Sequence, residues 1–225
     1  KTFSWPPTEL TTKWWGKALE NTGVRESLMA SFTAGAFATV IALALGTMLA
    51  FAVSRYDFFG KNAISLLVVL PISLPGIVTG IAMQNTFSRT FDLGLFSFKV
   101  GFGYHSLIMA HATFCVVVAY NNVVARLRRS SPNLLEASAD LGAHSFQTFV
   151  HITFPMIRSA LLAGGLLAFA LSFDEIVVTT FTAGNFQTLP QWILNNTFRA
   201  KNKAALDKYM DDCRNDRNEA PKKKK

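Results

Sequence analysis

Four long apolar stretches divide the chain, and short polar segments separate them. Residues 27–54, 62–88 and 100–125 contain no Asp, Glu, Lys or Arg, and residues 159–181 contain only the Asp174-Glu175 pair. A helix of about 20 mostly apolar residues is long enough to cross the hydrocarbon core of a bilayer. The pattern therefore predicts an all-α protein, a polytopic transmembrane helical bundle with about four to five spans in this chain.

Small residues recur at every fourth position of the first stretch: Ala34, Ala38, Ala42 and Gly46. This spacing places them along one face of a helix, and small residues let two membrane helices approach closely. We expect this face to pack against another helix rather than against lipid.

The second stretch contains the helix-breaking residues Pro71, Pro75 and Gly76. Such breaks survive in a membrane where neighbouring helices or a water-lined cavity satisfy the freed backbone groups. Two interpretations remain open for residues 62–88: a broken helix beside a transport pathway, or a simple kink.

Lys and Arg close to membrane spans mark the cytoplasmic side. The residues that do so here are Arg55, Lys61, Arg126, Arg128, Arg129 and Arg158. The loops that carry them are expected in the cytoplasm. Residues 1–26 then form an extracytoplasmic lead-in and residues 27–198 the transmembrane domain. Residues 199–225 form a hydrophilic basic tail, which we expect to be disordered.

Composition narrows the possible functions. Hydrophobic residues make up 50% of the chain and charged residues 16%, against about 25% charged in soluble domains. Much of the formal net charge of +8 lies in residues 199–225, which hold ten Lys/Arg and five Asp/Glu. Because no basic stripe with interleaved aromatics occurs elsewhere, we expect no nucleic-acid partner. Cys115 and Cys213 are too few for a disulfide framework.

The chain also lacks common catalytic motifs. No G-x-x-x-x-G-K-[ST] phosphate-binding pattern and no G-x-S-x-G elbow occurs in the sequence. His105 and His111 lie in the apolar stretch of residues 100–125, where a hydrogen-bonded packing role is commoner for a histidine than metal ligation. We expect no enzyme activity, no cofactor and no metal, and any ATP hydrolysis must come from a separate subunit.

The polar stretch of residues 130–157 has the pattern of a short cytoplasmic hairpin of helices. Ser131 can cap a helix that starts at Pro132, and Gly142 is suited to stop it. A second helix can begin at Ser145, and Pro155 is expected to set the turn back into the membrane. A pair of short amphipathic helices suits docking into a groove of a partner, although a plain connecting loop is the simpler alternative.

The spacing within this hairpin resembles the EAA motif of permease subunits of ABC transporters. The sequence reads Glu136-Ala137-Ser138, three residues, Gly142, nine residues, then Ile152-x-Phe154-Pro155. The family pattern is E-A-A, three residues, G, nine residues, I-x-L-P, so Ser138 and Phe154 depart from it. The resemblance implies that this loop is the coupling helix, seated in a cleft of a nucleotide-binding subunit. The coupling residues it implies are Glu136, Ala137, Ser138, Gly142, Ile152 and Pro155.

Further segments look like the polyamine branch of these permeases, which imports spermidine and putrescine. They are residues 57–62, 70–77, 111–115 and 171–175. The resemblance implies a multi-pass protein of the bacterial cytoplasmic (inner) membrane. It also implies an ABC ATPase, a second permease subunit and a periplasmic substrate-binding protein as partners. Family members typically have six spans, and because the first and last spans are missing here, we expect a fragment or a truncated member.

Asp174 and Glu175 form the second candidate site. A carboxylate in the middle of a membrane costs ~2.5–3.5 kcal/mol on insertion scales, which makes it a candidate functional group. A small cationic substrate needs anionic or aromatic contacts along its path, so we expect Asp174, Glu175 and Phe173 to line that path. The alternative is that the two carboxylates lie near the outer interface and are hydrated.

Three other functions remain open for the chain. It could be a permease-derived membrane scaffold that does not transport, an ABC permease for another small solute, or an intramembrane hydrolase that uses Asp174 and Glu175.

Overall fold

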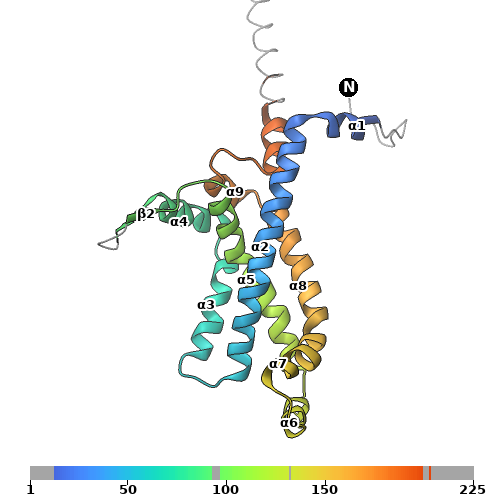
Figure 1. The fold of residues 1–225 in the computed structure, drawn as a ribbon. Helices are drawn as coiled ribbons and strands as arrows, with labels where there is room; N and C mark the ends of the chain where they lie inside the picture. The colour runs from blue at the N-terminus through green and yellow to red at the C-terminus, as the bar shows by residue number, and fades with distance from the viewer. Residues whose placement is uncertain (1–12, 93–96, 132, 200–202, 204–225) are drawn as a thin grey trace, which may run out of the picture.

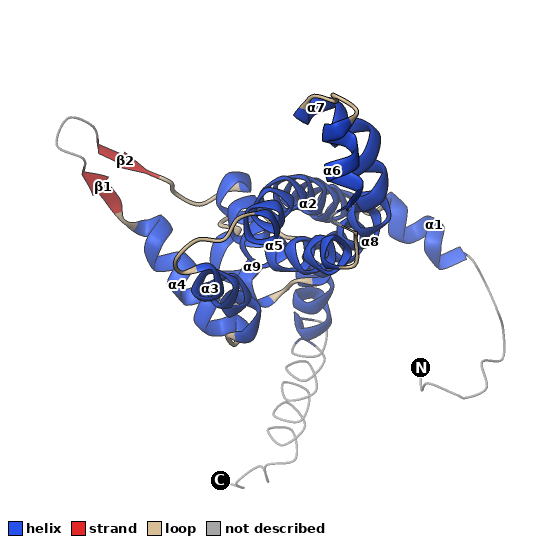
Figure 2. Ribbon diagram, turned by 90° about the horizontal axis from the view of Figure 1, so that it is seen from below, coloured by secondary structure: helices blue, strands red, loops and turns tan. Residues whose placement is uncertain are grey.

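Helix α5 (Tyr104–Arg128) is the centre of the computed structural model, and the long helices α2 (Thr22–Arg55) and α8 (Phe154–Asp174) pack against it (Figures 1 and 2). The structure describes residues 13–92, 97–131, 133–199 and 203. Fully buried side chains on α5 include Leu107, Val117 and Val123. Because α5 is apolar on several faces, it forms the core against which the other helices are positioned.

Helix α2 begins where Asn21 caps it, since the Asn21 side chain accepts hydrogen bonds from the N–H groups of Gly23 (2.9 Å) and Val24 (3.3 Å). Its stripe of small residues is buried, as predicted, and faces α5 most closely at Gly46. A Cβ added to Gly46 would lie 2.8 Å from the Cβ of Ala119. Glycine is therefore needed for this close approach of the two helices.

The region predicted as an extracytoplasmic lead-in contains helix α1 (Lys13–Glu20) and the start of α2. Residues 1–12 of this region lie outside the described residues, as does most of the basic tail. After α9 and a short loop, residues 189–199 form a further helical segment.

The second apolar stretch is broken, as its prolines and glycine predict. Helices α3 (Lys61–Ser73) and α4 (Gly76–Ser88) are bent by 98° relative to each other. Pro71 lies inside α3, and Pro75 directly precedes α4, so the break coincides with residues that cannot continue the hydrogen-bond ladder. Next come two short antiparallel strands, β1 (Thr90–Asp92) and β2 (Ser97–Lys99), which the sequence pattern indicated only as a polar loop.

The fourth apolar stretch is not one continuous helix, which corrects the expectation for residues 159–181. Helix α8 ends at Asp174, and the short helix α9 (Val177–Thr182) starts after a break at residues 175–176. Neither proline nor glycine lies at this break.

The described part of the chain has three helices that are long and apolar enough to cross a membrane, or four if α3 and α4 count as one broken span. The prediction of a helical bundle is confirmed, whereas the expected four to five spans are slightly more than the three or four that the described residues form. Many large apolar side chains on the outside of α2 and α8 are exposed, including Phe32, Phe37, Leu162 and Leu166. Such a surface suits contact with lipid or with further membrane helices.

Candidate functional site

The predicted cytoplasmic hairpin projects from one end of the bundle, at the bottom of Figure 1, and consists of α6 (Asn133–Asp140) followed by α7 (Ser145–Thr148). The name coupling hairpin is used here for residues 130–157. Pro132 lies outside the described residues. Helix α6 ends at Asp140, and Gly142, the residue predicted to stop it, has a φ of +79°.

Two backbone hydrogen bonds close the end of α6. The N–H of Gly142 donates to the carbonyl of Ala139 (2.9 Å), and the N–H of Ala143 donates to the carbonyl of Ser138 (3.1 Å). This pair of bonds is the Schellman motif, which needs a left-handed residue and therefore favours glycine. The local sequence thus explains why the first helix of the hairpin is short.

Pro155 does not set a turn, which corrects the sequence-based expectation. Helix α7 continues through a π-helical turn, η1 (Phe149–Thr153), directly into α8, and together they form one helix from Ser145 to Asp174. The N–H of Phe154 donates to the carbonyl of Phe149 in this turn. Because proline has no N–H to donate, a widened turn directly before Pro155 lets the helix pass the proline without a sharp bend.

Three polar contacts fix the coupling hairpin to itself and to the bundle. The hydroxyls of Ser138 and Thr148 lie 2.7 Å apart and join α6 to α7. The Arg55 guanidinium donates to the hydroxyl of Thr153 (3.4 Å) at the end of α2, and Arg126 Nε donates to the carbonyl of Met156 (2.9 Å).

The sequence pattern predicts Ser138 as a coupling residue that departs from the family motif, but it does not indicate the hydrogen-bond partner of Ser138. Ser138 is buried, and Thr148 is the side chain that satisfies it. No local pattern identifies such a pair, since the two residues lie on different helices.

The predicted coupling residues divide into exposed and covered positions. Glu136, Ala137, Gly142 and Pro155 are exposed, Ile152 is half-buried and Ser138 is buried. The most prominent apolar side chains of the hairpin are Leu141, with 88% of its surface exposed, and Phe146, with 77% exposed. Large apolar side chains at the tip of a polar hairpin suit burial against another protein.

The predicted substrate-path residues lie at the far end of α8. Asp174 is exposed, whereas Phe173 and Glu175 are half-buried. One Glu175 carboxylate oxygen accepts the N–H of Val178 (3.0 Å), so Glu175 caps the start of α9. Among the described residues Asp174 makes no hydrogen bond or ion pair. The two neighbouring carboxylates therefore have different surroundings.

The aromatic residues near these carboxylates do not all face one path. The Phe173 and Phe169 rings lie 5.8 Å apart between centroids, and Phe169 also contacts Phe32 of α2 at 5.6 Å. Phe181, in contrast, packs against α4, where a Cβ on Gly80 would lie 2.4 Å from the Phe181 ring.

The depth of Asp174 follows from the length of α8. At about 1.5 Å per residue, Asp174 lies about 24 Å along the helix axis from Arg158, the residue predicted to mark the cytoplasmic side. A hydrocarbon core is about 30 Å thick. If Arg158 lies at the inner boundary, as the positive-inside prediction has it, this distance corresponds to the outer third of such a core, where either an outer path or a hydrated interface is expected.

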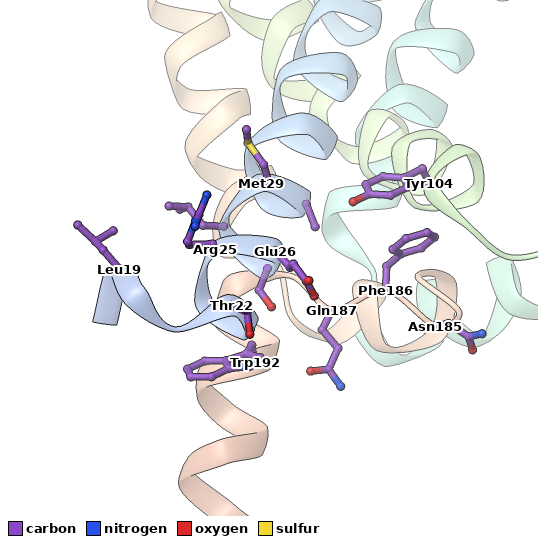
Figure 3. Close-up of a pocket in the computed structure, with 14 residues that line it drawn as sticks. Leu19, Thr22, Arg25, Glu26, Met29, Tyr104, Asn185, Phe186, Gln187 and Trp192 are labelled. Carbon is purple, nitrogen blue, oxygen red and sulfur yellow. The ribbon is translucent and has the colours of Figure 1, made fainter. Parts of the chain in front are cut away.

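A large open pocket lies farther out, beside the start of α2 (Figure 3). It has a volume of about 1050 Å³, and its lining includes Glu26, Arg25, Tyr104, Phe186 and Trp192. Within the described part of the chain, no cluster of three or more His, Cys, Asp or Glu has the arrangement of a metal site.

Comparison with known proteins identifies relatives over most of the chain. The model of a family described as "Binding-protein-dependent transport system inner membrane component" matches residues 16–206. The chain is 31% identical over 188 residues to the putrescine transport system permease protein PotI of Escherichia coli (strain K12), covering 82% of this chain and 66% of PotI. It is 33% identical over 181 residues to the spermidine/putrescine transport system permease protein PotC of the same strain, covering 80% and 66%.

The chain thus spans just under two thirds of the length of these two relatives. A solved structure with the same fold is a bacterial ABC transporter involved in the import of the acidic polysaccharide alginate, with a TM-score of 0.59. The similarity covers 84% of this chain and 63% of that one, at 14% sequence identity. At this identity the likeness concerns the fold.

Proposed function

This chain belongs to the family of binding-protein-dependent transport system inner membrane components, and from that membership we propose that it is a permease subunit of an ATP-driven ABC importer of polyamines. The family consists of inner-membrane transport components rather than enzymes. The substrate, the partners and the transport activity of this chain are the parts that we propose.

The observation that carries the proposal is the coupling hairpin. It presents Leu141 and Phe146 at the end of the bundle that is predicted to face the cytoplasm, within the register that resembles the EAA motif. Since the chain has no phosphate-binding loop of its own, ATP must act through a subunit that contacts this surface. A partner that binds two conformations of the hairpin with different affinity can drive the change between them.

The continuity of α7, η1 and α8 supports this mechanism. A displacement of the hairpin is passed along one helix from Ser145 to Asp174, without a flexible loop in between. The residues proposed to contact the ATPase are Glu136, Ala137, Ser138, Gly142, Ile152 and Pro155. The remaining proposed partners are a second permease subunit and a periplasmic substrate-binding protein.

The substrate class is proposed from two observations. PotI and PotC are permeases for putrescine and for spermidine and putrescine, and α8 ends in two carboxylates that suit a polycation. We propose that Asp174, Glu175 and Phe173 line the substrate path. Because the alginate importer has the same fold, the fold alone does not select a cation.

Uptake of radiolabelled putrescine and spermidine into proteoliposomes tests the proposal. The vesicles contain the chain with an ABC ATPase, a second permease and a binding protein. We expect uptake that requires ATP, and we expect Gly142→Asp to abolish it, because the substitution strains the left-handed turn and places a charge at the interface.

Gly60→Asp is the matched control. Gly60 also has a positive φ (+90°) and open space around it, but it lies in the cytoplasmic turn before α3. Uptake that survives in Gly60→Asp and fails in Gly142→Asp supports the coupling role. Equal uptake in both variants would exclude that role, and ATP-driven uptake of an unrelated solute in place of polyamines would reject the substrate.

A further inference from the structure

A buried histidine connects the two sides of the break between α8 and α9. His111 of α5 has no exposed surface. Its Nδ1 lies 2.7 Å from the hydroxyl of Ser172, in the last turn of α8. Its Nε2 lies 3.0 Å from the hydroxyl of Thr179, near the start of α9. The His111 ring, on α5, thus contacts residues of both α8 and α9.

Counting protons gives one arrangement for this network. The Thr179 hydroxyl donates its only proton to the backbone carbonyl of Glu175 (2.7 Å), so its oxygen accepts from His111 Nε2–H. Nδ1 of His111 then accepts the proton of Ser172. Every member is satisfied, and the neutral ring has no free nitrogen for a metal or a substrate. The name His111 brace is used for His111, Ser172, Thr179 and the Glu175 carbonyl.

The His111 brace spans the break between α8 and α9, at which neither proline nor glycine lies. The carbonyl of Glu175, freed where the helix stops, accepts from Thr179, and the Glu175 carboxylate caps α9 through Val178. The backbone carbonyl and the side-chain carboxylate of Glu175 therefore both accept hydrogen bonds within the break. Asp174, in contrast, is exposed and has no hydrogen-bond or ion-pair partner within the described part of the chain.

Helix α4, which follows the break after α3, packs against α9. A Cβ on Gly76, the first residue of α4, would lie 3.5 Å from Val177, the first residue of α9. One turn farther on, Gly80 meets Phe181. The breaks between α3 and α4 and between α8 and α9 therefore lie side by side, and the His111 brace fixes one of them to the central helix α5.

We propose that His111 is a positioning residue that holds the α8–α9 break so that Asp174, rather than Glu175, is the carboxylate presented to a cationic substrate. This inference rests on the proposed function for the identity of the substrate. The geometry of the brace does not depend on it.

The number of polyamine molecules taken up per ATP hydrolysed tests the inference in the full reconstituted complex. Asp174→Asn and His111→Ala are each expected to lower this ratio about tenfold, since both disturb substrate contact and not ATPase docking. Glu175→Gln keeps an oxygen that can cap α9, and its effect should be clearly smaller than that of Asp174→Asn. His111→Gln, which retains one donor and one acceptor, should recover part of the loss.

Cys115→Ala is the matched control. Cys115 lies one turn after His111 on α5, is equally buried, and contacts the Ala168 carbonyl of α8 below the break (3.3 Å). A merely structural role for His111 predicts that both variants reduce the amount of assembled complex and leave the ratio unchanged. That result, or a Glu175→Gln effect as large as that of Asp174→Asn, would overturn the inference.

A second measurement is independent of the substrate. In a background that carries Cys115→Ala and Cys213→Ser, Asp174→Cys is labelled in membranes with a cationic methanethiosulfonate reagent. Adding His111→Ala, or Ser172→Ala if the former does not assemble, should change the labelling rate at least about fivefold. An unchanged rate rejects the brace. A changed rate in a complex that takes up no polyamine would reject the proposed function and retain the brace.

Discussion

The coupling hairpin and the α8–α9 break lie at opposite ends of one continuous helix and are built in opposite ways. The hairpin is defined by neighbouring residues and exposes its apolar side chains Leu141 and Phe146. The break is spanned by buried hydrogen bonds from His111 of α5 and exposes one carboxylate, Asp174. The hairpin is therefore suited to contact with another protein, and the break depends on contacts within the chain. Substitutions in the two regions should consequently affect different properties.

The largest effect is expected for Phe146→Glu in the hairpin. A charge at an apolar contact of this kind costs ~2–4 kcal/mol of binding, which corresponds to about 30-fold or more in affinity for the ATPase. Affinity is measured with purified complexes, and the thermal unfolding midpoint in detergent should stay unchanged. Phe59→Glu, at a still more exposed phenylalanine of the α2–α3 turn, is the control. A similar loss of affinity in both variants would contradict an interface restricted to the hairpin.

An intermediate effect is expected for Gly80→Ala beside the break. The added Cβ would lie 2.4 Å from the Phe181 ring, and overpacking of this kind lowers the free energy of unfolding by ~1–3 kcal/mol. Here the unfolding midpoint should fall while the ATPase still binds. Gly16→Ala, on α1 with open space around it, should not be destabilising. An unfolding midpoint unaffected by Gly80→Ala would show that α4 and α9 are not closely packed.

The smallest effect is expected for Ser138→Ala, which removes the hydrogen bond to Thr148 between α6 and α7. A neutral hydrogen bond contributes ~1 kcal/mol, so ATPase affinity should fall about fivefold or less. Ser130→Ala removes only a bond within one turn of α5, to the Arg126 carbonyl, and should change affinity less. If Ser138→Ala bound the ATPase as tightly as the unmodified chain, the Ser138–Thr148 bond would have no part in the shape of the hairpin.

The sequence predicted those features that local chemistry determines. Gly142 stops α6, the small residues of α2 face α5, and Pro75 with Gly76 separates α3 from α4. Each of these signals lies within a few residues of its effect. The same local reasoning was wrong at Pro155, because a π-helical turn accommodates the proline within a continuous helix.

The α8–α9 break had no such signal. Glu175 and Ile176 are ordinary helix residues, and the residue that contacts both sides of the break is His111, which is 61 positions before Ser172 and 68 before Thr179. Hydrogen bonds over such distances become visible only once the helices are packed. The roles of Asp174, Glu175 and Phe173 in a substrate path therefore stay predictions, and the structure sharpens them by giving the two carboxylates different surroundings.

The most direct test of the coupling role is a site-specific cross-link from the tip of the hairpin. In a background without the two native cysteines, Leu141→Cys is treated with a short thiol–thiol cross-linker in membranes that also contain the ATPase with cysteines around its expected docking cleft. We predict a cross-linked product of the two subunits whose yield changes when ATP is added, and no product from Phe59→Cys. No cross-link from Leu141→Cys, or equal yields from both positions with and without ATP, would contradict the role of this hairpin as the coupling element.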